Sequence, residues 1–157
     1  MPPSTHSSSS SIPAGKWNHS KPRGGESLPY GPHPGNVYTH LLEQMRLSPG
    51  HVFVVIDPPD HSPEQVKQIA QAGDRAGVSA FAVGGSLGAQ GKILDECIAA
   101  IKSVSQKPVI LFPGNIATIS PLADAAYYLS MLNSLDPYYI SGAQMAAAYP
   151  VSKMGLE

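Results

Sequence analysis

The sequence predicts an α/β fold built around a parallel sheet. Three short apolar runs, at residues 51–56, 79–83 and 109–112, suit strands that are buried on both faces. The segments between them repeat apolar residues every three or four positions, which is typical of helices packed against a sheet. Strands that alternate with helices form parallel sheets through right-handed crossovers.

The first helices have recognisable starts and inner faces. An apolar stripe within residues 41–45 predicts a short helix before the first strand. The stretch Ser62-Pro63-Glu64-Gln65 combines an N-cap serine, a proline in the first turn and a glutamine placed to complete a capping box. Gly77 suits the C-terminal end of that helix, and another helix is expected from about Lys92 to Val104.

The C-terminal third continues the alternation. Ser120 and Pro121 predict a short helical turn, and residues 125–132 predict a fourth strand. Asp136-Pro137 predict the start of a last helix that ends near Pro150. From these elements alone, the sheet is either open and doubly wound or part of a (β/α)8 barrel, which typically needs about 250 residues.

Length and composition favour one domain preceded by a tail. The chain has 157 residues and a single cysteine, which excludes an internal disulfide. Its formal net charge of -1 gives no indication of nucleic-acid binding. The sequence shows no secretory signal and no apolar stretch long enough for a bilayer, so we expect a cytoplasmic protein. Residues 1–35 are rich in Ser, Pro and Gly, which predicts a disordered tail ahead of a domain over residues 36–157.

Polar residues follow three of the expected strands, at the end where α/β proteins bind ligands. Asp57 follows the first strand, Gly84-Gly85-Ser86 ends the second, and Asn115 follows the third. We expect the side chains of Asp57 and Ser86 to lie close enough to share one cation. Gly84 and Gly85 allow the backbone to approach phosphate oxygens and to offer N–H donors.

A series of short motifs in order resembles one known family, from about Val37 to the C-terminus. The motifs are Ile56-Asp57-Pro58, Val83-Gly84-Gly85-Ser86, Pro108 to Asn115, Ile119-Ser120, Ala123-Asp124-Ala125 and Leu132-Asn133-Ser134. They resemble geranylgeranylglyceryl phosphate synthase and its bacterial heptaprenylglyceryl phosphate synthase relatives. The resemblance implies a TIM-barrel fold, of which this chain would supply about the first half, as four strand-helix units.

The resemblance also implies a reaction. Members of the family transfer a geranylgeranyl or other polyprenyl group from its diphosphate to the C3 hydroxyl of sn-glycerol 1-phosphate, which makes the first ether bond of archaeal-type membrane lipids. Mg²⁺ binds the diphosphate, and the family's metal ligands match Asp57 and Ser86. Gly84, Gly85 and Asn115 are then expected on the diphosphate. The lipid substrate suggests a peripheral membrane contact, and a homo-oligomer is compatible with the resemblance.

The same residues have structural explanations. Asp57 suits a turn before proline, Ser86 a helix N-cap, and Asn115 a left-handed turn. Cys97 is expected in the core, and Asp124 in a turn. Four tyrosines are open to two interpretations, ordinary packing or the wall of a prenyl groove: Tyr127, Tyr128, Tyr138 and Tyr139.

The chain departs from the family pattern in two ways. Where the family commonly reads Asp-Pro-Asp-Lys, this sequence has Asp57-Pro58-Pro59-Asp60, so an acid replaces a basic residue. The family's glycerol-phosphate site lies mainly in later strands, so we expect this C-terminally truncated chain alone to be a poor catalyst. Two alternatives stay open: a non-catalytic half-barrel fragment that binds diphosphate or assembles with another chain, and a different phosphate-binding barrel enzyme acting on a sugar phosphate.

Overall fold

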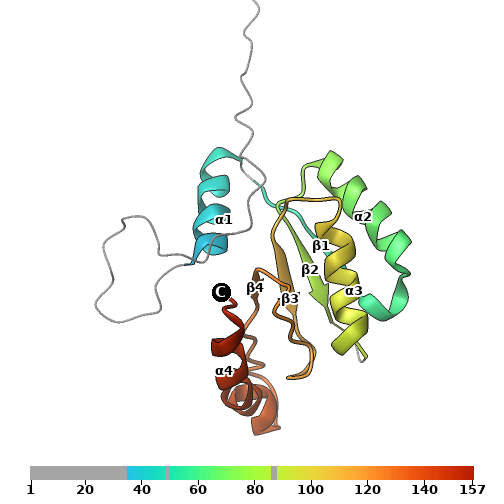
Figure 1. The fold of residues 1–157 in the computed structure, drawn as a ribbon. Coiled ribbons are helices and arrows are strands. Elements are labelled where there is room, and N and C mark those ends of the chain that lie inside the picture. Colours follow the sequence, from blue (N-terminus) through green and yellow to red (C-terminus); the bar gives the residue numbers. More distant parts are fainter. Residues whose placement is uncertain (1–34, 49, 86–87) are drawn as a thin grey trace, which may run out of the picture.

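The fold is a parallel sheet with two helices along one face and a third helix over part of the other (Figure 1). The computed structural model describes residues 35–48, 50–85 and 88–157, so the tail predicted for residues 1–35 lies outside the described residues apart from Gly35. Within the described part, four parallel strands form one sheet in the order β1-β2-β3-β4. Helices α2 and α3 pack on one face of this sheet, and α1 packs on the other.

The elements alternate along the chain much as the sequence predicts. Their bounds are α1 (Asn36–Leu47), β1 (Phe53–Ile56), the 3-10 turn η1 (Pro58–Asp60), α2 (Pro63–Ala76), β2 (Ala80–Gly84), α3 (Gly91–Lys102), β3 (Val109–Phe112), β4 (Ala125–Ala126), the π-helical turn η2 (Tyr138–Gly142) and α4 (Ala143–Met154).

The helix signals in the sequence act locally. Ser62 and Gln65 form the predicted capping box: the Ser62 hydroxyl accepts from the Gln65 N–H at 3.3 Å, and the Gln65 side chain accepts from the Ser62 N–H at 2.8 Å. Gly77 ends α2 with φ +77°, a left-handed conformation that favours glycine. These contacts fix the bounds of α2, whose Val66 and Ala70 belong to the same buried cluster as Phe81 of β2.

The main core lies between the sheet and the pair α2 and α3. Alternate residues of β2 and β3, including Phe81, Val83 and Leu111, meet Leu94 and Ile98 of α3 there, all of them fully buried. A burial of this kind contributes about 1.5–3 kcal/mol for each large apolar side chain. The apolar residues that recur along α3 therefore face the sheet, as the sequence predicts.

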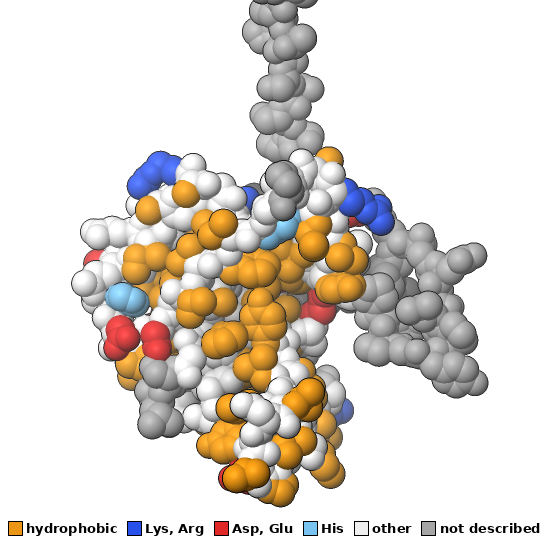
Figure 2. Space-filling model, turned by 180° about the vertical axis from the view of Figure 1, so that it is seen from behind, with side chains coloured by type: hydrophobic (Ala, Val, Ile, Leu, Met, Phe, Trp, Pro, Cys, Tyr) orange, Lys and Arg blue, Asp and Glu red, His pale blue; other side chains and the backbone are white. Residues whose placement is uncertain are grey.

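The opposite face of the sheet is only partly covered. Val37 of α1 packs on Ala80, Ile110 and Ala125, which lie at or near the amino ends of their strands. On the edge strand β1 and at the carboxyl end of β3, the apolar side chains of Phe53, Val55 and Phe112 stay exposed. Figure 2 shows hydrophobic side chains over the centre of the molecule and over its lower lobe. This exposure is what an open half-barrel predicts for its inner face.

Three boundaries differ from the sequence prediction. The fourth strand contains Ala125–Ala126 instead of the predicted residues 125–132. The reason is that the following loop bonds to η2: the N–H of Met131 donates to the Tyr139 carbonyl at 2.9 Å, and the Ser130 hydroxyl donates to the Ile140 carbonyl. The last helix begins with a π-helical turn and continues beyond Pro150 to Met154.

The connection between β3 and β4 contains a turn in place of the predicted short helix. The Ser120 hydroxyl accepts from the Leu122 N–H at 3.2 Å, and the Ser120 carbonyl accepts from the Ala123 N–H at 3.4 Å. The Ser120 hydroxyl also donates to Asp95 of α3. The third strand of this partial barrel is thus followed by a tightly bonded loop, and only the other strands carry helices.

Candidate functional site

The carboxyl ends of β1, β2 and β3 bring most of the predicted site residues to one edge of the sheet. Ile56 pairs with Val83, and Gly84 pairs with Phe112, so the strands end side by side. Asp57 follows β1, and its Oδ2 lies 3.7 Å from the position that a Cβ atom on Gly85 would occupy. The predicted neighbourhood of the first-strand carboxylate and the Gly-Gly turn is therefore present.

The two glycines are required by backbone geometry. Gly84 has φ +125° and Gly85 has φ +118°, both in the region that L side chains rarely adopt. A Cβ atom on Gly84 would also lie 2.5 Å from the carbonyl oxygen of Phe112. A backbone free of side chains at this turn can approach a phosphate closely and offer N–H groups to it.

The structure describes only Asp57 of the two predicted metal ligands, Asp57 and Ser86. Ser86 lies outside the described residues, whereas Asp57 is half-buried beside Gly85. Within the described ranges, no three His, Cys, Asp or Glu side chains form a group able to hold a metal ion. A single carboxylate at a ligand-binding edge suits Mg²⁺, which keeps several waters and takes one or two protein ligands, better than it suits zinc.

The charge of Asp57 affects a neighbouring thiol. Burial raises the pKa of the Cys97 thiol to about 12, and the negative charge of Asp57 makes a smaller contribution in the same direction. Cys97 is a free, buried cysteine on the inner face of α3, as the sequence predicts. The thiol is therefore protonated at neutral pH and acts as a core residue.

Asn115 lies at the same edge, in a turn after β3. Its Oδ1 accepts from the Ala117 N–H at 2.8 Å, and its carbonyl accepts from the Thr118 N–H at 3.1 Å. The turn predicted for Asn115 is thus present, and in this turn the Asn115 side chain uses its Oδ1 as an acceptor. Thr118 is fully buried beneath Gly84, and its hydroxyl has no hydrogen-bond partner among the described residues.

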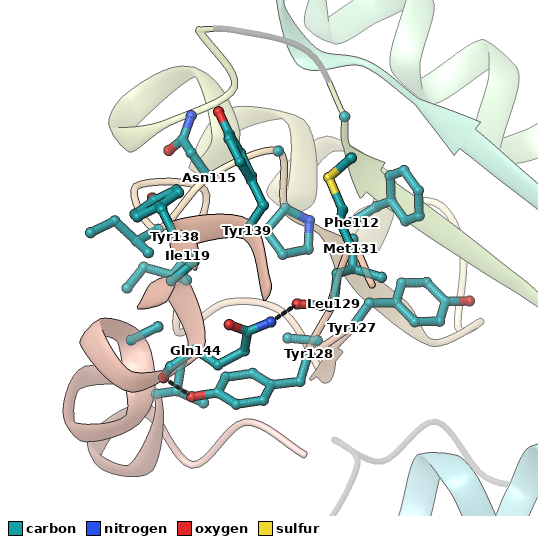
Figure 3. Close-up of a pocket in the computed structure, with 18 residues that line it drawn as sticks. Phe112, Asn115, Ile119, Tyr127, Tyr128, Leu129, Met131, Tyr138, Tyr139 and Gln144 are labelled. Carbon is teal, nitrogen blue, oxygen red and sulfur yellow. Dashed lines mark hydrogen bonds between the residues drawn. The ribbon is translucent and has the colours of Figure 1, made fainter. Parts of the chain in front are cut away.

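An apolar cavity of about 230 Å³ opens beside Gly85 and Asn115 and extends to α4 (Figure 3). Its walls come from the end of β3, the β3–β4 loop, the loop after β4, η2 and α4. The lining residues are Gly85, Phe112, Pro113, Gly114, Asn115, Ile116, Ile119, Ala126, Tyr127, Tyr128, Leu129, Met131, Tyr138, Tyr139, Ala143, Gln144, Ala147 and Val151. A pocket with this lining suits a hydrocarbon chain.

All four of the tyrosines singled out in the sequence line this cavity. Tyr127 packs edge-to-face on Phe112 with ring centroids 5.6 Å apart, and Tyr138 packs on Tyr139 at 5.1 Å. Tyrosine side chains of this set therefore pack against other rings and line the cavity at the same time. Tyr128 donates a hydrogen bond to the Gln144 carbonyl, which joins the loop to α4 (Figure 3).

Gln144 and Met131 are pocket residues that the sequence analysis did not identify. The Gln144 side-chain nitrogen donates to the Leu129 carbonyl, while its oxygen is buried without a partner among the described residues. A polar residue in an otherwise apolar helix segment is the signal that points to Gln144. Met131 carries no comparable signal, because its place depends on its backbone bond to Tyr139.

Asp124 lies at the opposite end of the sheet and has a structural role. Its Oδ2 accepts from the Val109 N–H at 2.8 Å, and its Oδ1 accepts from the Lys102 ammonium at 2.7 Å. These bonds join α3, β3 and β4 at the amino ends of the strands. Asp124 therefore organises the chain before β4, as expected, and takes no part in the pocket.

Parallel strands with an apolar pocket and phosphate-compatible turns at their carboxyl ends define a partial barrel of the ligand-binding (β/α) class. The sequence profile of the PcrB family matches residues 42–157, and the chain belongs to the PcrB family. The family prediction made from the motifs is confirmed. Among residues 35–48, 50–85 and 88–157, none of the helices has both the length and the apolar character needed to cross a bilayer.

Curated relatives are similar over most of this chain. Geranylgeranylglyceryl phosphate synthase of Thermococcus kodakarensis is 45% identical over 123 residues, which are 78% of this chain and 48% of the relative. The synthase of Pyrococcus abyssi is also 45% identical over 123 residues, 78% of this chain and 49% of the relative. The chain thus spans about half the length of these relatives.

Solved structures agree with the sequence comparison. The (S)-3-O-geranylgeranylglyceryl phosphate synthase of Thermoplasma acidophilum, in complex with its substrate sn-glycerol-1-phosphate, superposes with a TM-score of 0.68 at 36% identity, covering 77% of this chain and 48% of that one. The enzyme of Thermoplasma volcanium gives a TM-score of 0.69 at 36% identity, covering 74% of this chain and 48% of that one. The predicted partial TIM barrel is confirmed.

Proposed function

We propose that this chain provides the diphosphate and prenyl side of a transferase that joins a geranylgeranyl group to the C3 hydroxyl of sn-glycerol 1-phosphate. One observation carries the proposal: the apolar cavity opens directly beside Gly85 and Asn115. A prenyl diphosphate has an apolar tail and a charged head, and the two parts of the site match them. The named activity of the relatives and the substrate bound to the Thermoplasma acidophilum enzyme support the same reaction.

In this proposal the residues at the carboxyl ends of the strands bind the diphosphate, either directly or through Mg²⁺. Asp57 and Ser86 hold Mg²⁺, and the N–H groups around Gly84 and Gly85 with the Asn115 side chain bind phosphate oxygens. Mg²⁺ supplies a positive charge that offsets the negative charge developing on the leaving diphosphate. The cavity holds the prenyl chain in one orientation and excludes water from it. Pro59 and Asp60 replace the family's Asp-Lys pair, so this loop offers no cation to the anion.

A second candidate is a non-catalytic half-barrel that binds diphosphate or assembles with another chain. The exposed inner-face side chains of Phe53 and Val55, on an edge strand, favour it. A cytoplasmic location, a homo-oligomer and a peripheral membrane contact belong to the proposal as well. The use of a single cysteine, Cys97, is compatible with this location.

The test compares two aspartates of the same segment. Geranylgeranyl diphosphate and Mg²⁺ are added to wild-type chain, to Asp57→Asn and to Asp60→Asn, and binding is measured by calorimetry. Asp57→Asn should weaken Mg²⁺-dependent binding by about tenfold or more, which is ~1.4 kcal/mol, while exposed Asp60→Asn should match wild type. Equal binding by all three proteins would remove Asp57 from the site.

Product formation then separates the candidates. With sn-glycerol 1-phosphate added, ether-lipid product detected by mass spectrometry supports the transferase, whereas diphosphate binding without product supports the non-catalytic half-barrel. Turnover of a sugar phosphate without any prenylated product would instead support the other barrel enzyme considered from the sequence.

A further inference from the structure

The C-terminal part of the chain is almost free of charge. Between Asp124 and Lys153, the only charged residue is Asp136. About a quarter of the residues in an average soluble domain are charged. This segment contains β4, η2 and α4, and its helical part forms the lower lobe of the molecule in Figures 1 and 2, beside the cavity.

Two leucines project from this lobe. They belong to residues 129–136, named here the pocket loop, in which Leu132 is 83% exposed and Leu135 is fully exposed. The loop is not free to fold them inward, because Met131 bonds to the Tyr139 carbonyl at 2.9 Å and the Ser134 N–H bonds to the Met131 carbonyl at 3.0 Å. Large apolar side chains held in water in this way mark an interaction surface.

The pocket loop also forms part of the cavity wall. Leu129 and Met131 line the cavity, and Leu132 follows them directly in the chain. Tyr128 and Tyr139 are exposed at the same rim, each with an apolar ring and a polar hydroxyl. Aromatic residues of this kind are enriched where a protein meets the boundary between lipid and water.

We propose that the pocket loop inserts Leu132 and Leu135 into the surface of a lipid bilayer and thereby places the mouth of the cavity against the membrane. This inference rests on the proposed function, because a prenyl chain held in a bilayer then enters the cavity without crossing water. The near absence of charge means that the contact depends on apolar insertion and not on anionic lipids. Two projecting leucines fit a bilayer better than a protein interface, which buries about 800 Å² on each partner.

The test measures vesicle binding by the full chain. Wild type, Leu132→Asp/Leu135→Asp and the control Leu47→Asp are sedimented with neutral phosphatidylcholine vesicles. Leu47 is a suitable control because it is 81% exposed and lies in α1, outside the pocket loop. The double variant should lose about tenfold or more of its vesicle partition coefficient, and the control should match wild type. No vesicle binding by wild type, or equal binding by all three proteins, would overturn the inference.

A fluorescent reporter gives an independent readout. The chain has one tryptophan, Trp17, so Trp17→Phe provides a silent background for Leu135→Trp or Leu47→Trp. Vesicles should shift the emission of the Leu135→Trp protein to the blue and leave that of the Leu47→Trp protein unchanged. Sedimentation velocity tests whether the two leucines instead form a contact between protein chains. If the double variant changes oligomeric state but keeps its vesicle binding, the inference is wrong.

Detergent separates this inference from the function on which it rests. In micelles, the double variant should bind geranylgeranyl diphosphate as wild type does, because Leu132 and Leu135 are not pocket residues. Diphosphate binding by wild type without vesicle binding refutes only the membrane contact of the pocket loop. Vesicle binding that needs the two leucines, without diphosphate binding, refutes the proposed function and leaves the membrane contact established.

Discussion

The carboxylate of Glu157 caps the first turn of α1: its Oε2 accepts from the Val37 N–H and its Oε1 from the Tyr38 N–H, both at 2.6 Å. Among the described residues, no side chain of α1 or its N-cap position caps this turn, since Gly35 has no side chain and the first turn has no acidic residue. The backbone of Glu157 meanwhile pairs with β4, where its carbonyl accepts from the Ala126 N–H at 2.9 Å. One residue therefore ties α1 to the sheet over 120 positions of sequence.

Glu157→Ala should release α1 from the sheet. The change removes two charge-assisted bonds and the favourable contact with the helix dipole, which together amount to about 1–3 kcal/mol. Amide hydrogen exchange should speed up across α1, while α2 and α3 keep their protection. Glu43→Ala is the control, because Glu43 is an exposed carboxylate on the same helix but lies outside its first turn. Equal exchange in the two variants would contradict the capping role.

Asp124→Ala should destabilise the whole fold. It leaves the buried Val109 N–H and the Lys102 ammonium without their acceptor, at a cost of about 2–3 kcal/mol in the free energy of unfolding. The surface pair Lys92–Glu96 is the control: its side chains are 87% and 50% exposed, so Glu96→Ala should change stability by at most about 0.5 kcal/mol. Urea denaturation measures both, and a similar midpoint for the two variants would refute the structural role of Asp124.

The sequence predicts well those features that depend on neighbouring residues. The capping box at Ser62 and Gln65 acts within one turn, and the periodicity of α3 reflects one buried face. The proximity of Asp57 and Gly85 was also predictable, because parallel strands bring their carboxyl ends to one edge.

Features set by distant contacts were not predictable. Residues 127–132 resemble a strand in composition, but hydrogen bonds from Ser130 and Met131 to η2 end the strand at Ala126. Met131 of this loop lines the cavity together with Gln144 of α4, so the cavity depends on contacts between segments that local patterns do not reveal. No local pattern reveals that Glu157 caps a helix at the other end of the domain.

Gly84→Ala should disrupt the turn at the end of β2. The new Cβ atom would meet the Phe112 carbonyl oxygen at 2.5 Å, in addition to the strain of φ +125°. Gly91→Ala is the matched control, since Gly91 has φ +57° but open space around the added atom. The Gly84 variant should be less stable than the Gly91 variant by about 1–3 kcal/mol in urea denaturation. Equal stability would show that the backbone of β3 at Phe112 can shift at little cost in stability.

Cys97 should make stability depend on alkaline pH. The pKa of its thiol is raised to about 12 in the folded chain from an ordinary value of 9.0, chiefly by burial. Above pH 9 the unfolded chain loses this proton and the folded chain keeps it, so the contribution is complete below pH 9 and is lost as pH rises toward 12. Between pH 8 and pH 10, wild type should lose about 1 kcal/mol more than Cys97→Ala. Identical losses in urea denaturation at the two pH values would contradict a buried, protonated thiol.

Tyr139→Asp should impair prenyl binding without unfolding the chain. Tyr139 lines the cavity yet is 43% exposed, so the variant tolerates the change while a charge now faces the apolar wall. Desolvating that carboxylate against a hydrocarbon chain should weaken geranylgeranyl diphosphate binding by about tenfold or more. Tyr38→Asp, at a 55% exposed tyrosine of α1, is the control and should bind as wild type does.

Inorganic diphosphate separates the two parts of the site, because it has no tail. Its Mg²⁺-dependent binding should be the same in wild type and in Tyr139→Asp. If Tyr139→Asp weakens the two ligands equally, Tyr139 acts on the head group, and the cavity does not hold the prenyl chain.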